Sequence, residues 1–235
     1  MSIANFVHLR VHSEFSLYDS VIRVKKLVGA AKNLNMPAVA LTDQSNMYAL
    51  LKFYKACLGE GVKPILGADL WLENPEDIQA PFRITALCQT PEGYLGLREL
   101  ISRGFMEDQH FDRVMIKKEW LFEKHDGLIL LSGARDGEIG QRVLKGKLDA
   151  AERLVMEYHQ VFGDRFYLEV QRTGRPGDEA LVKAFMALGG RHRVPLVATN
   201  DVRFLKADDF EAHETRVAIG QGYALEDKRR PREYS

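Results

Sequence analysis

Residues 6–19 read FVHLRVHSEFSLYD, in which an apolar, strand-like run from Phe6 to Val11 leads directly into polar side chains. Residues two apart on a strand lie on the same face, about 7 Å from each other, so Arg10 and His12 point the same way. A pair of histidines at this spacing, or a histidine with an aspartate, would be a metal-binding element. Arginine cannot ligate a cation, because its guanidinium group stays protonated and has no lone pair to donate. This stretch therefore predicts a strand that ends in a polar pocket, with an arginine where a ligand would be expected.

Short apolar runs alternate with amphipathic helical patterns along the rest of the chain. In residues 21–34, for example, apolar side chains recur every three or four positions, which is typical of a helix with one buried face. Continuous apolar strands separated by such helices predict a mostly parallel sheet covered by helices. Seven repeats favour an α/β fold of the distorted (β/α)7 TIM-like barrel type, and an open sheet is the alternative. The expected strands are Phe6–Val11, Ala38–Thr42, Lys63–Leu72, Arg83–Cys88, Leu128–Leu131, Phe166–Val170 and Pro195–Thr199, and the expected helices are Val21–Leu34, Leu50–Leu58, Glu92–Phe105, Leu148–Phe162 and Asp178–Leu188.

Length and composition are those of a soluble globular domain. The chain has 235 residues, of which 46% are hydrophobic and 28% charged, enough for one sizeable core. Its net charge of zero gives no bulk attraction to nucleic acid or to an anionic membrane. Cys57 and Cys88 are too few for a disulfide framework, and we expect both to be buried in a reducing compartment. The sequence shows no signal-peptide pattern and no apolar run long enough to cross a bilayer, so we expect a cytoplasmic protein.

We expect a single barrel domain over residues 1–222 and a polar connector over residues 223–235. The connector contains a charge run, DKRRPR at residues 227–232, which favours a solvated segment, with a phosphate-contacting patch as the alternative. EAHE at residues 211–214 resembles a zinc-protease helix only superficially, because the second histidine four residues after the first is missing. A charge cluster on a helix surface is the preferred interpretation.

Polar residues gather where the predicted strands end. His12 and Asp43 follow the first two strands, Asp201 follows the last, and Asp69 lies within the third apolar run. In parallel barrels these ends form the rim of the functional site. Asp201 and Arg203 form a second doublet on one strand face. Because buried carboxylates are costly unless they are paired or bound to a metal, the pattern predicts a pocket.

Five motifs, in this order, resemble the PHP (polymerase and histidinol phosphatase) domain at the N terminus of the alpha subunit of bacterial DNA polymerase III, the replicative C-family polymerase. They are FVHLRVHSEFSLYD, ALTDQSN, PILGAD, LLSGARDGEIG and VATNDVRF, and together they span nearly the whole chain. The resemblance implies a cluster of two or three metal ions held by nine ligands. Position by position, these nine correspond to Arg10, His12, Asp19, Gln44, Asp69, Arg83, Ala134, Asp201 and Arg203.

Three of these positions, His12, Asp19 and Asp201, keep the residue type of the family, and Asp69 replaces a glutamate. The five departures are Arg10, Gln44, Arg83, Ala134 and Arg203. The resemblance therefore implies a degenerate metal site, with no catalytic residue and no bound metal. We expect the guanidinium charges of Arg10, Arg83 and Arg203 to stand in for the missing cations, because carboxylates left without them would repel one another.

The resemblance implies a non-catalytic, scaffolding PHP domain in a parent protein that performs template-directed DNA synthesis. The implied partners are the proofreading exonuclease subunit, the polymerase core of the same chain and, indirectly, the primer–template, with no membrane contact. The domain would need no cofactor of its own, whereas the parent polymerase would use magnesium in a palm that lies outside these residues. The alternatives are a metal-dependent phosphoesterase and a vestigial domain that binds phosphate or pyrophosphate through the same three arginines.

Overall fold

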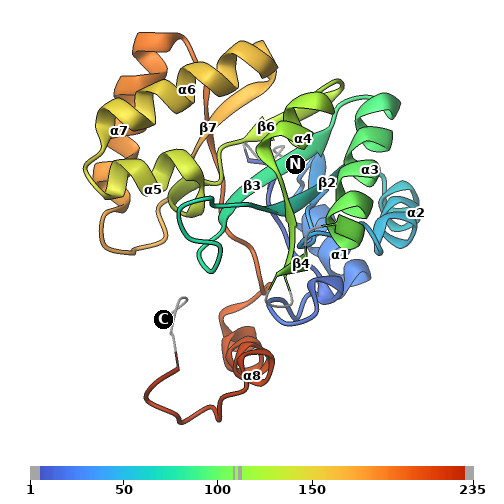
Figure 1. Cartoon of the computed structure of the whole chain (residues 1–235). Helices are drawn as coiled ribbons and strands as arrows, with labels where there is room; N and C mark the ends of the chain where they lie inside the picture. Colours follow the sequence, from blue (N-terminus) through green and yellow to red (C-terminus); the bar gives the residue numbers. More distant parts are fainter. Residues whose placement is uncertain (1–5, 108, 111–112, 231–235) are drawn as a thin grey trace.

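The apolar runs of the sequence form a curled sheet with helices packed against it (Figure 1). The structure is a computed structural model that describes residues 6–107, 109–110 and 113–230. Neighbouring strands follow the order β4-β5-β2-β3-β6-β7-β8, and β1 pairs with β2 beside this path. The strands are β1 (Ala38–Leu41), β2 (Lys63–Leu72), β3 (Phe82–Cys88), β4 (Gln109–His110), β5 (Arg113–Ile116), β6 (Leu128–Leu131), β7 (Phe166–Val170) and β8 (Leu196–Ala198).

The described residues contain eight α-helices, most of which lie between successive strands. The larger apolar core lies between the sheet and α3, α4, α6 and α7, and a second core joins α1 and α2 to β1. No helix in this part of the chain is both long and apolar enough to cross a membrane. The helices are α1 (Val24–Asn33), α2 (Leu50–Glu60), α3 (Pro91–Glu107), α4 (Lys118–Glu123), α5 (Glu138–Leu144), α6 (Leu148–Phe162), α7 (Asp178–His192) and α8 (Phe210–Gln221), and the 3-10 turns are η1 (Glu14–Ser16), η2 (Ala134–Asp136), η3 (Gly163–Arg165) and η4 (Ala207–Asp209).

The sheet is mixed, which corrects the expectation of a mostly parallel one. Strand β3 runs antiparallel to both β2 and β6, whereas β1–β2, β6–β7 and β7–β8 are parallel pairs. The connection from β2 to β3 covers only residues 73–81, which is too short for a parallel crossover with a helix. The α/β fold of the distorted TIM-like type is confirmed, with two strands pointing in the opposite direction: β3 and the two-residue strand β4, which is antiparallel to β5.

The first expected strand, residues 6–11, does not form a regular strand. Val11 instead makes an isolated parallel bridge with Val202, and the amide of His12 donates to the carbonyl of Val202 at 3.1 Å. On the other side, the carbonyl of Val11 accepts from the amide of Thr42 at 2.9 Å. These contacts join the end of β1 to the segment that follows β8, and they bring the two polar doublets of the sequence side by side.

Candidate functional site

Seven of the nine predicted site positions meet in one buried cluster. The first segment, the loop after η1, β2, β3 and the segment after β8 each contribute side chains. Arg83 reaches the cluster because β3 is antiparallel to β2, so that the start of β3 lies beside the end of β2, with Arg83 opposite Trp71. Hydrogen bonds and ion pairs connect Arg10, His12, Asp19, Asp69, Arg83, Asp201 and Arg203.

Asp69, in the middle of β2, is the centre of the cluster and is completely buried. Its Oδ2 lies 3.0 Å from Nε and 2.9 Å from Nη2 of Arg10, and 3.0 Å from Nε2 of His12. Its Oδ1 accepts a hydrogen bond of 2.6 Å from the hydroxyl of Thr85. Burial alone would raise the pKa of Asp69, but Arg10 and His12 outweigh burial and hold this pKa well below its ordinary value. The carboxylate is therefore ionised, and its oxygens are already directed at cations and donors.

Arg203 lies between two carboxylates. Its Nη1 pairs with Asp19, while its Nε and Nη2 lie 2.9 and 2.7 Å from Oδ1 of Asp201. Burial would raise the pKa of both aspartates, but Arg203 keeps each pKa below its ordinary value, with help from Arg10 at Asp201. This fork-like arrangement suits a guanidinium group, whose planar donors can serve two acceptors at once.

His12 also lies between two carboxylates. Its Nδ1 is 3.1 Å from both oxygens of Asp19, and its Nε2 faces Asp69. Both ring nitrogens can donate only in the imidazolium form. Burial and Arg203 lower the pKa of His12, but the two aspartates outweigh them, so this pKa is raised above its ordinary value.

Glu169 on β7 completes the cluster, and the sequence interpretation missed it. Its Oε1 lies 3.7 Å from Nη1 of Arg10 and accepts a hydrogen bond from the hydroxyl of Thr199, which in turn accepts from Gln171 at 2.9 Å. Burial raises the pKa of Glu169, although Arg10 and Thr199 act in the opposite direction. The available signal was a lone carboxylate in the otherwise apolar strand FYLEV, which is costly unless it is paired.

The cluster leaves little room for a divalent cation. Three guanidinium groups and one imidazole already face three aspartates and Glu169, so no carboxylate charge is left to be neutralised. A metal ion near Asp69 or Asp201 would lie against Arg10 and Arg203, which repel it. In the described part of the chain, no group of three or more histidine, cysteine, aspartate or glutamate side chains is arranged to hold a metal. The residues present therefore do not fit the metal cluster that the family resemblance implies.

Two of the predicted site positions contribute backbone contacts or packing and no charge. Gln44 donates from Nε2 to the carbonyl of Asp69 at 3.0 Å. Ala134 is buried at the start of η2, after Gly133, which has a φ of 78° and lies so close to β3 that a Cβ there would be 2.0 Å from the carbonyl oxygen of Arg83.

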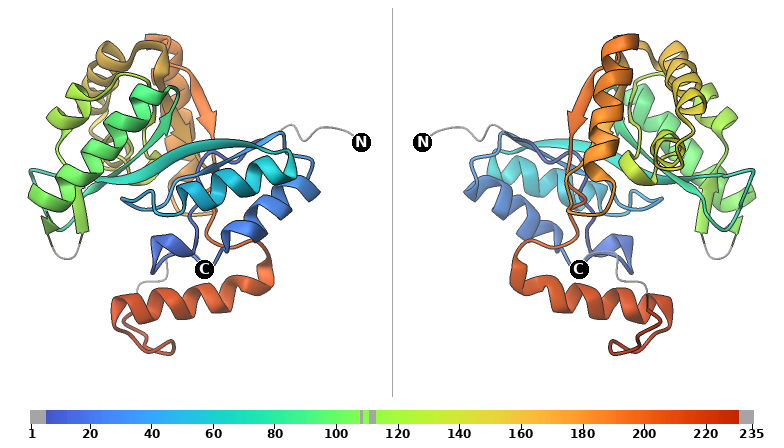
Figure 2. Two further views of the ribbon diagram at one scale, coloured as in Figure 1. Left: turned by 90° about the vertical axis from the view of Figure 1, so that its right-hand side faces the viewer. Right: turned by 90° about the vertical axis from the view of Figure 1, so that its left-hand side faces the viewer.

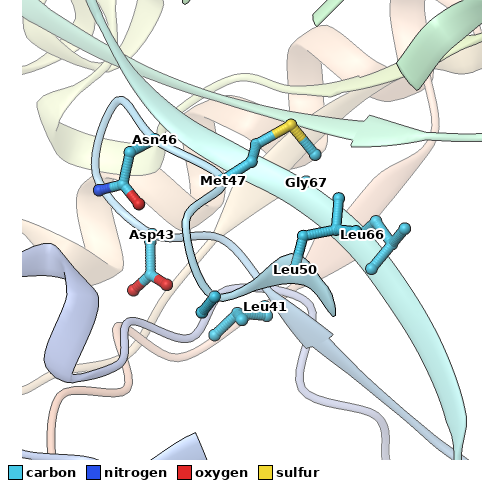
Figure 3. A pocket seen from close by; sticks show the side chains of 8 residues that line it. Leu41, Asp43, Asn46, Met47, Leu50, Leu66 and Gly67 are labelled. Carbon is cyan, nitrogen blue, oxygen red and sulfur yellow. The ribbon is translucent and has the colours of Figure 1, made fainter. Parts of the chain in front are cut away.

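Asp43, which we expected at the rim, stabilises a loop. Its carboxylate accepts from the amide and hydroxyl of Ser13, at 2.6 and 2.8 Å, and from the hydroxyl of Ser16 at 2.7 Å. Beside it lies a cavity of about 10 Å³, lined by Asn46 and Met47 among others (Figure 3). That volume is at the lower limit for one water molecule, so this cavity cannot hold a substrate.

The family with the description "PHP domain" matches residues 8–173. The chain belongs to the PHP family. It is 53% identical over 232 residues to the DNA polymerase III subunit alpha of Pseudomonas fluorescens, and 43% identical over 235 residues to that of Escherichia coli K12. These alignments cover 99% and 100% of this chain but only 20% of each relative, so the chain spans about one fifth of the length of the curated relatives it matches. The region matched is the N-terminal part of those subunits, which confirms the resemblance predicted from the five motifs.

Solved structures of the same fold include two proteins at 12% sequence identity. An amidohydrolase from Chromobacterium violaceum aligns with a TM-score of 0.55, and a putative metal-dependent phosphoesterase from Bifidobacterium adolescentis with a TM-score of 0.51. Each alignment covers 89% of this chain and 96% of the other. At this identity the likeness shows a shared fold and says nothing about shared chemistry.

Proposed function

We propose that this PHP domain is a non-catalytic structural part of a replicative DNA polymerase. The position of Arg203 carries the proposal, since its guanidinium group occupies the space between Asp19 and Asp201 and pairs with both. Both aspartates correspond to metal ligands in the family resemblance, so the guanidinium group of Arg203 lies where a metal ion would be needed. A fixed, permanently charged side chain can neutralise carboxylates, but it cannot activate water or polarise a phosphate ester as a metal ion does.

Arg10 and Arg83 support the same interpretation. Arg10 is completely buried, and Asp69, Asp201 and Glu169 raise its pKa despite the opposing effect of burial. Arg83 extends the network outward, with nitrogens 3.5 and 3.7 Å from Asp69 and Asp19, and it stacks on Trp71 at 4.5 Å. The cluster thus connects segments that are far apart in the chain, as a structural centre would.

The activity and partners of the complete protein are inferred from the similarity to DNA polymerase III alpha subunits. We infer that the complete protein carries out template-directed DNA synthesis in the cytoplasm, using magnesium in a palm outside these residues. We further infer that this domain contributes architecture near the primer–template and docks the proofreading exonuclease subunit. Identity of 43–54% to DNA polymerase III alpha subunits supports these inferences.

The two alternatives receive less support from the site. Anion binding would require donors that can turn to an incoming phosphate, but the side chains of Arg10 and Arg203 are fully buried and already directed at carboxylates. Only Arg83, with 11% of its side chain exposed, faces the surface. Phosphoester hydrolysis would require cations that the cluster does not accommodate.

A hydrolysis assay tests the non-catalytic proposal. We expect no turnover of p-nitrophenyl phosphate or of DNA 3′ ends by the purified chain in the presence of manganese, zinc or magnesium. Asp201→Asn serves as the matched control, because activity that persists in this variant comes from a contaminant. Turnover that Asp201→Asn abolishes would refute the proposal.

Docking is tested separately by size-exclusion chromatography of the complete polymerase subunit with the purified exonuclease subunit. Co-elution at micromolar concentration, lost when this domain is removed from the subunit, is the expected result. Unchanged co-elution without the domain would contradict the docking proposal and leave the hydrolysis result untouched.

A further inference from the structure

The segment after α8 folds back onto that helix through a buried ion pair. Nη2 of Arg230 lies 2.7 Å from Oε2 of Glu214, and the two side chains are only 3% and 7% exposed. The charge run at residues 227–232, of which 231–232 lie outside the described residues, was expected to be solvated, and EAHE at residues 211–214 was expected on a helix surface. Both expectations are wrong for these side chains, because Arg230, Glu214 and His213 are all buried.

The other side of α8 contacts the loop that follows η1. Nε2 of His213 lies 3.1 Å from the backbone carbonyl of Asp19 and can donate to it. Arg216 donates from Nε to the carbonyl of Leu17 and from Nη2 to the carbonyl of Glu14 at 3.3 Å. Figure 2 shows α8, in red, directly beneath this blue N-terminal segment in both views.

Close packing near the end of α8 adds to these hydrogen bonds. Gly220 lies against the ring of Tyr18, so that a Cβ at this glycine would be 2.7 Å from the ring. The helix therefore contacts the loop at both ends and in the middle.

The loop itself needs such support, because its backbone is strained. Leu17 has φ 59° and ψ −70°, a conformation that L-residues with large side chains rarely adopt. Strained residues persist only where surrounding contacts fix them. The carbonyl of Leu17 is one of the groups to which Arg216 donates, so α8 supplies part of this constraint.

The same loop carries Asp19 into the charged cluster. Asp19 pairs with Arg203 and lies 3.1 Å from His12, and its side chain is 21% exposed, whereas that of Asp69 is fully buried. Movement of the loop would therefore remove one carboxylate from the cluster and expose Arg203.

We propose that α8 and residues 223–230 act as a latch that holds the Asp19 loop over the charged cluster, with the Arg230–Glu214 pair as its anchor. The latch links the C-terminal end of the described chain to the cluster through Glu214, His213 and the backbone of Asp19. Displacing Arg230 loosens α8, releases the strained loop and opens the cluster on that side. This inference rests on contacts within the chain and does not depend on the non-catalytic proposal.

Hydrogen–deuterium exchange of the whole 235-residue chain tests the latch. We expect Arg230→Met to speed amide exchange in residues 14–20 by about tenfold or more, while exchange in β2 and β6 stays unchanged. The matched control is Arg229→Met, because this neighbouring arginine is 82% exposed and pairs with Asp227 of the same segment. Unchanged exchange at residues 14–20 in Arg230→Met, or an equal rise in both variants or throughout the sheet, overturns the proposal.

A second variant keeps the test decisive if Arg230→Met does not fold. Glu214→Gln preserves the shape of its partner and removes its charge, and we expect it to speed exchange in the same loop. In the double variant Glu214→Gln/Arg230→Met, exchange should rise no further than in the more affected single variant, because both changes break one contact. Additive effects in the double variant would show that the two side chains act separately, against the proposal.

Discussion

Replacing Arg203 with methionine would remove the charge that separates Asp19 from Asp201 while keeping much of the side-chain length. Removing one partner of a buried ion pair typically costs about 3–5 kcal/mol, because the remaining charge stays buried and unpaired. The aspartate side chains are 21% and 10% exposed, so solvent offsets part of this cost and the lower end of the range applies. For a chain of this length, about 3 kcal/mol corresponds to a fall in Tm of roughly 6–12 °C.

Differential scanning calorimetry at pH 7 measures this loss, with Arg153→Met as the matched control because Arg153 is exposed on α6. The double variant Arg203→Met/Asp201→Asn should recover part of the lost stability, since it also removes one of the two carboxylates that lose Arg203 as a partner. A Tm of Arg203→Met within one degree of the wild type would refute the reasoning, and so would a double variant that loses the sum of two independent penalties.

Three further predictions concern the surroundings of this pair. The three aspartates of the cluster have folded-state pKa values held below the ordinary value of about 3.9, so the stability they contribute is present above that pH and lost as the pH falls from about 5 towards 3. Urea denaturation should show that Arg203→Met loses less stability over this pH range than the wild type does. Equal losses in the two proteins would contradict the assignment of the lowered pKa values to Arg203. Glu169 has the opposite sign, because burial raises its pKa and its contribution is lost as the pH rises through the folded-state value. Glu169→Gln should therefore gain stability relative to the wild type as the pH rises above the ordinary glutamate value of about 4.3. A stability difference that does not change with pH would argue against a buried, desolvated carboxyl group. Gly133→Ala should lower the free energy of unfolding by about 3 kcal/mol or more, because its Cβ would meet the carbonyl of Arg83. Gly146→Ala, the control, is also at positive φ but in open space, and it should cost about 1 kcal/mol. Equal urea midpoints for the two variants would contradict the predicted clash at Gly133.

The periodicity of the sequence was sufficient to predict most strands and the long helices, because each needs a continuous apolar face. The direction of β3 was predicted wrongly although the sequence contained a signal, since only residues 73–82 separate the two expected strands, too few for a parallel crossover. Strand β5 (Arg113–Ile116) was missed because its first residue is exposed and its second only half-buried, so it lacks the continuous apolar run that marks the equally short β1 and β6. Helices α4 and α5 were missed because six and seven residues are too few for a helical period to show. Residues 6–11 have the composition of a strand, but tertiary bridges at Val11 replace a regular ladder.

For the site, the motifs predicted which positions converge, and the structure brings seven of them into contact. Glu169 escaped because no motif marks it, although an isolated carboxylate in an apolar strand was a usable signal. The burial of Glu214 and Arg230 was hidden for another reason. A charged residue is normally exposed, and only its partner sixteen positions away in the chain makes burial acceptable.

Anomalous X-ray diffraction from crystals grown with excess manganese tests most directly whether guanidinium groups replace metal ions in this cluster. We predict no anomalous peak within the cluster, with the guanidinium group of Arg203 between Asp19 and Asp201 as in the present structure. Strong peaks ligated by His12 and the aspartates, with the arginine side chains displaced from the cluster, would contradict the account.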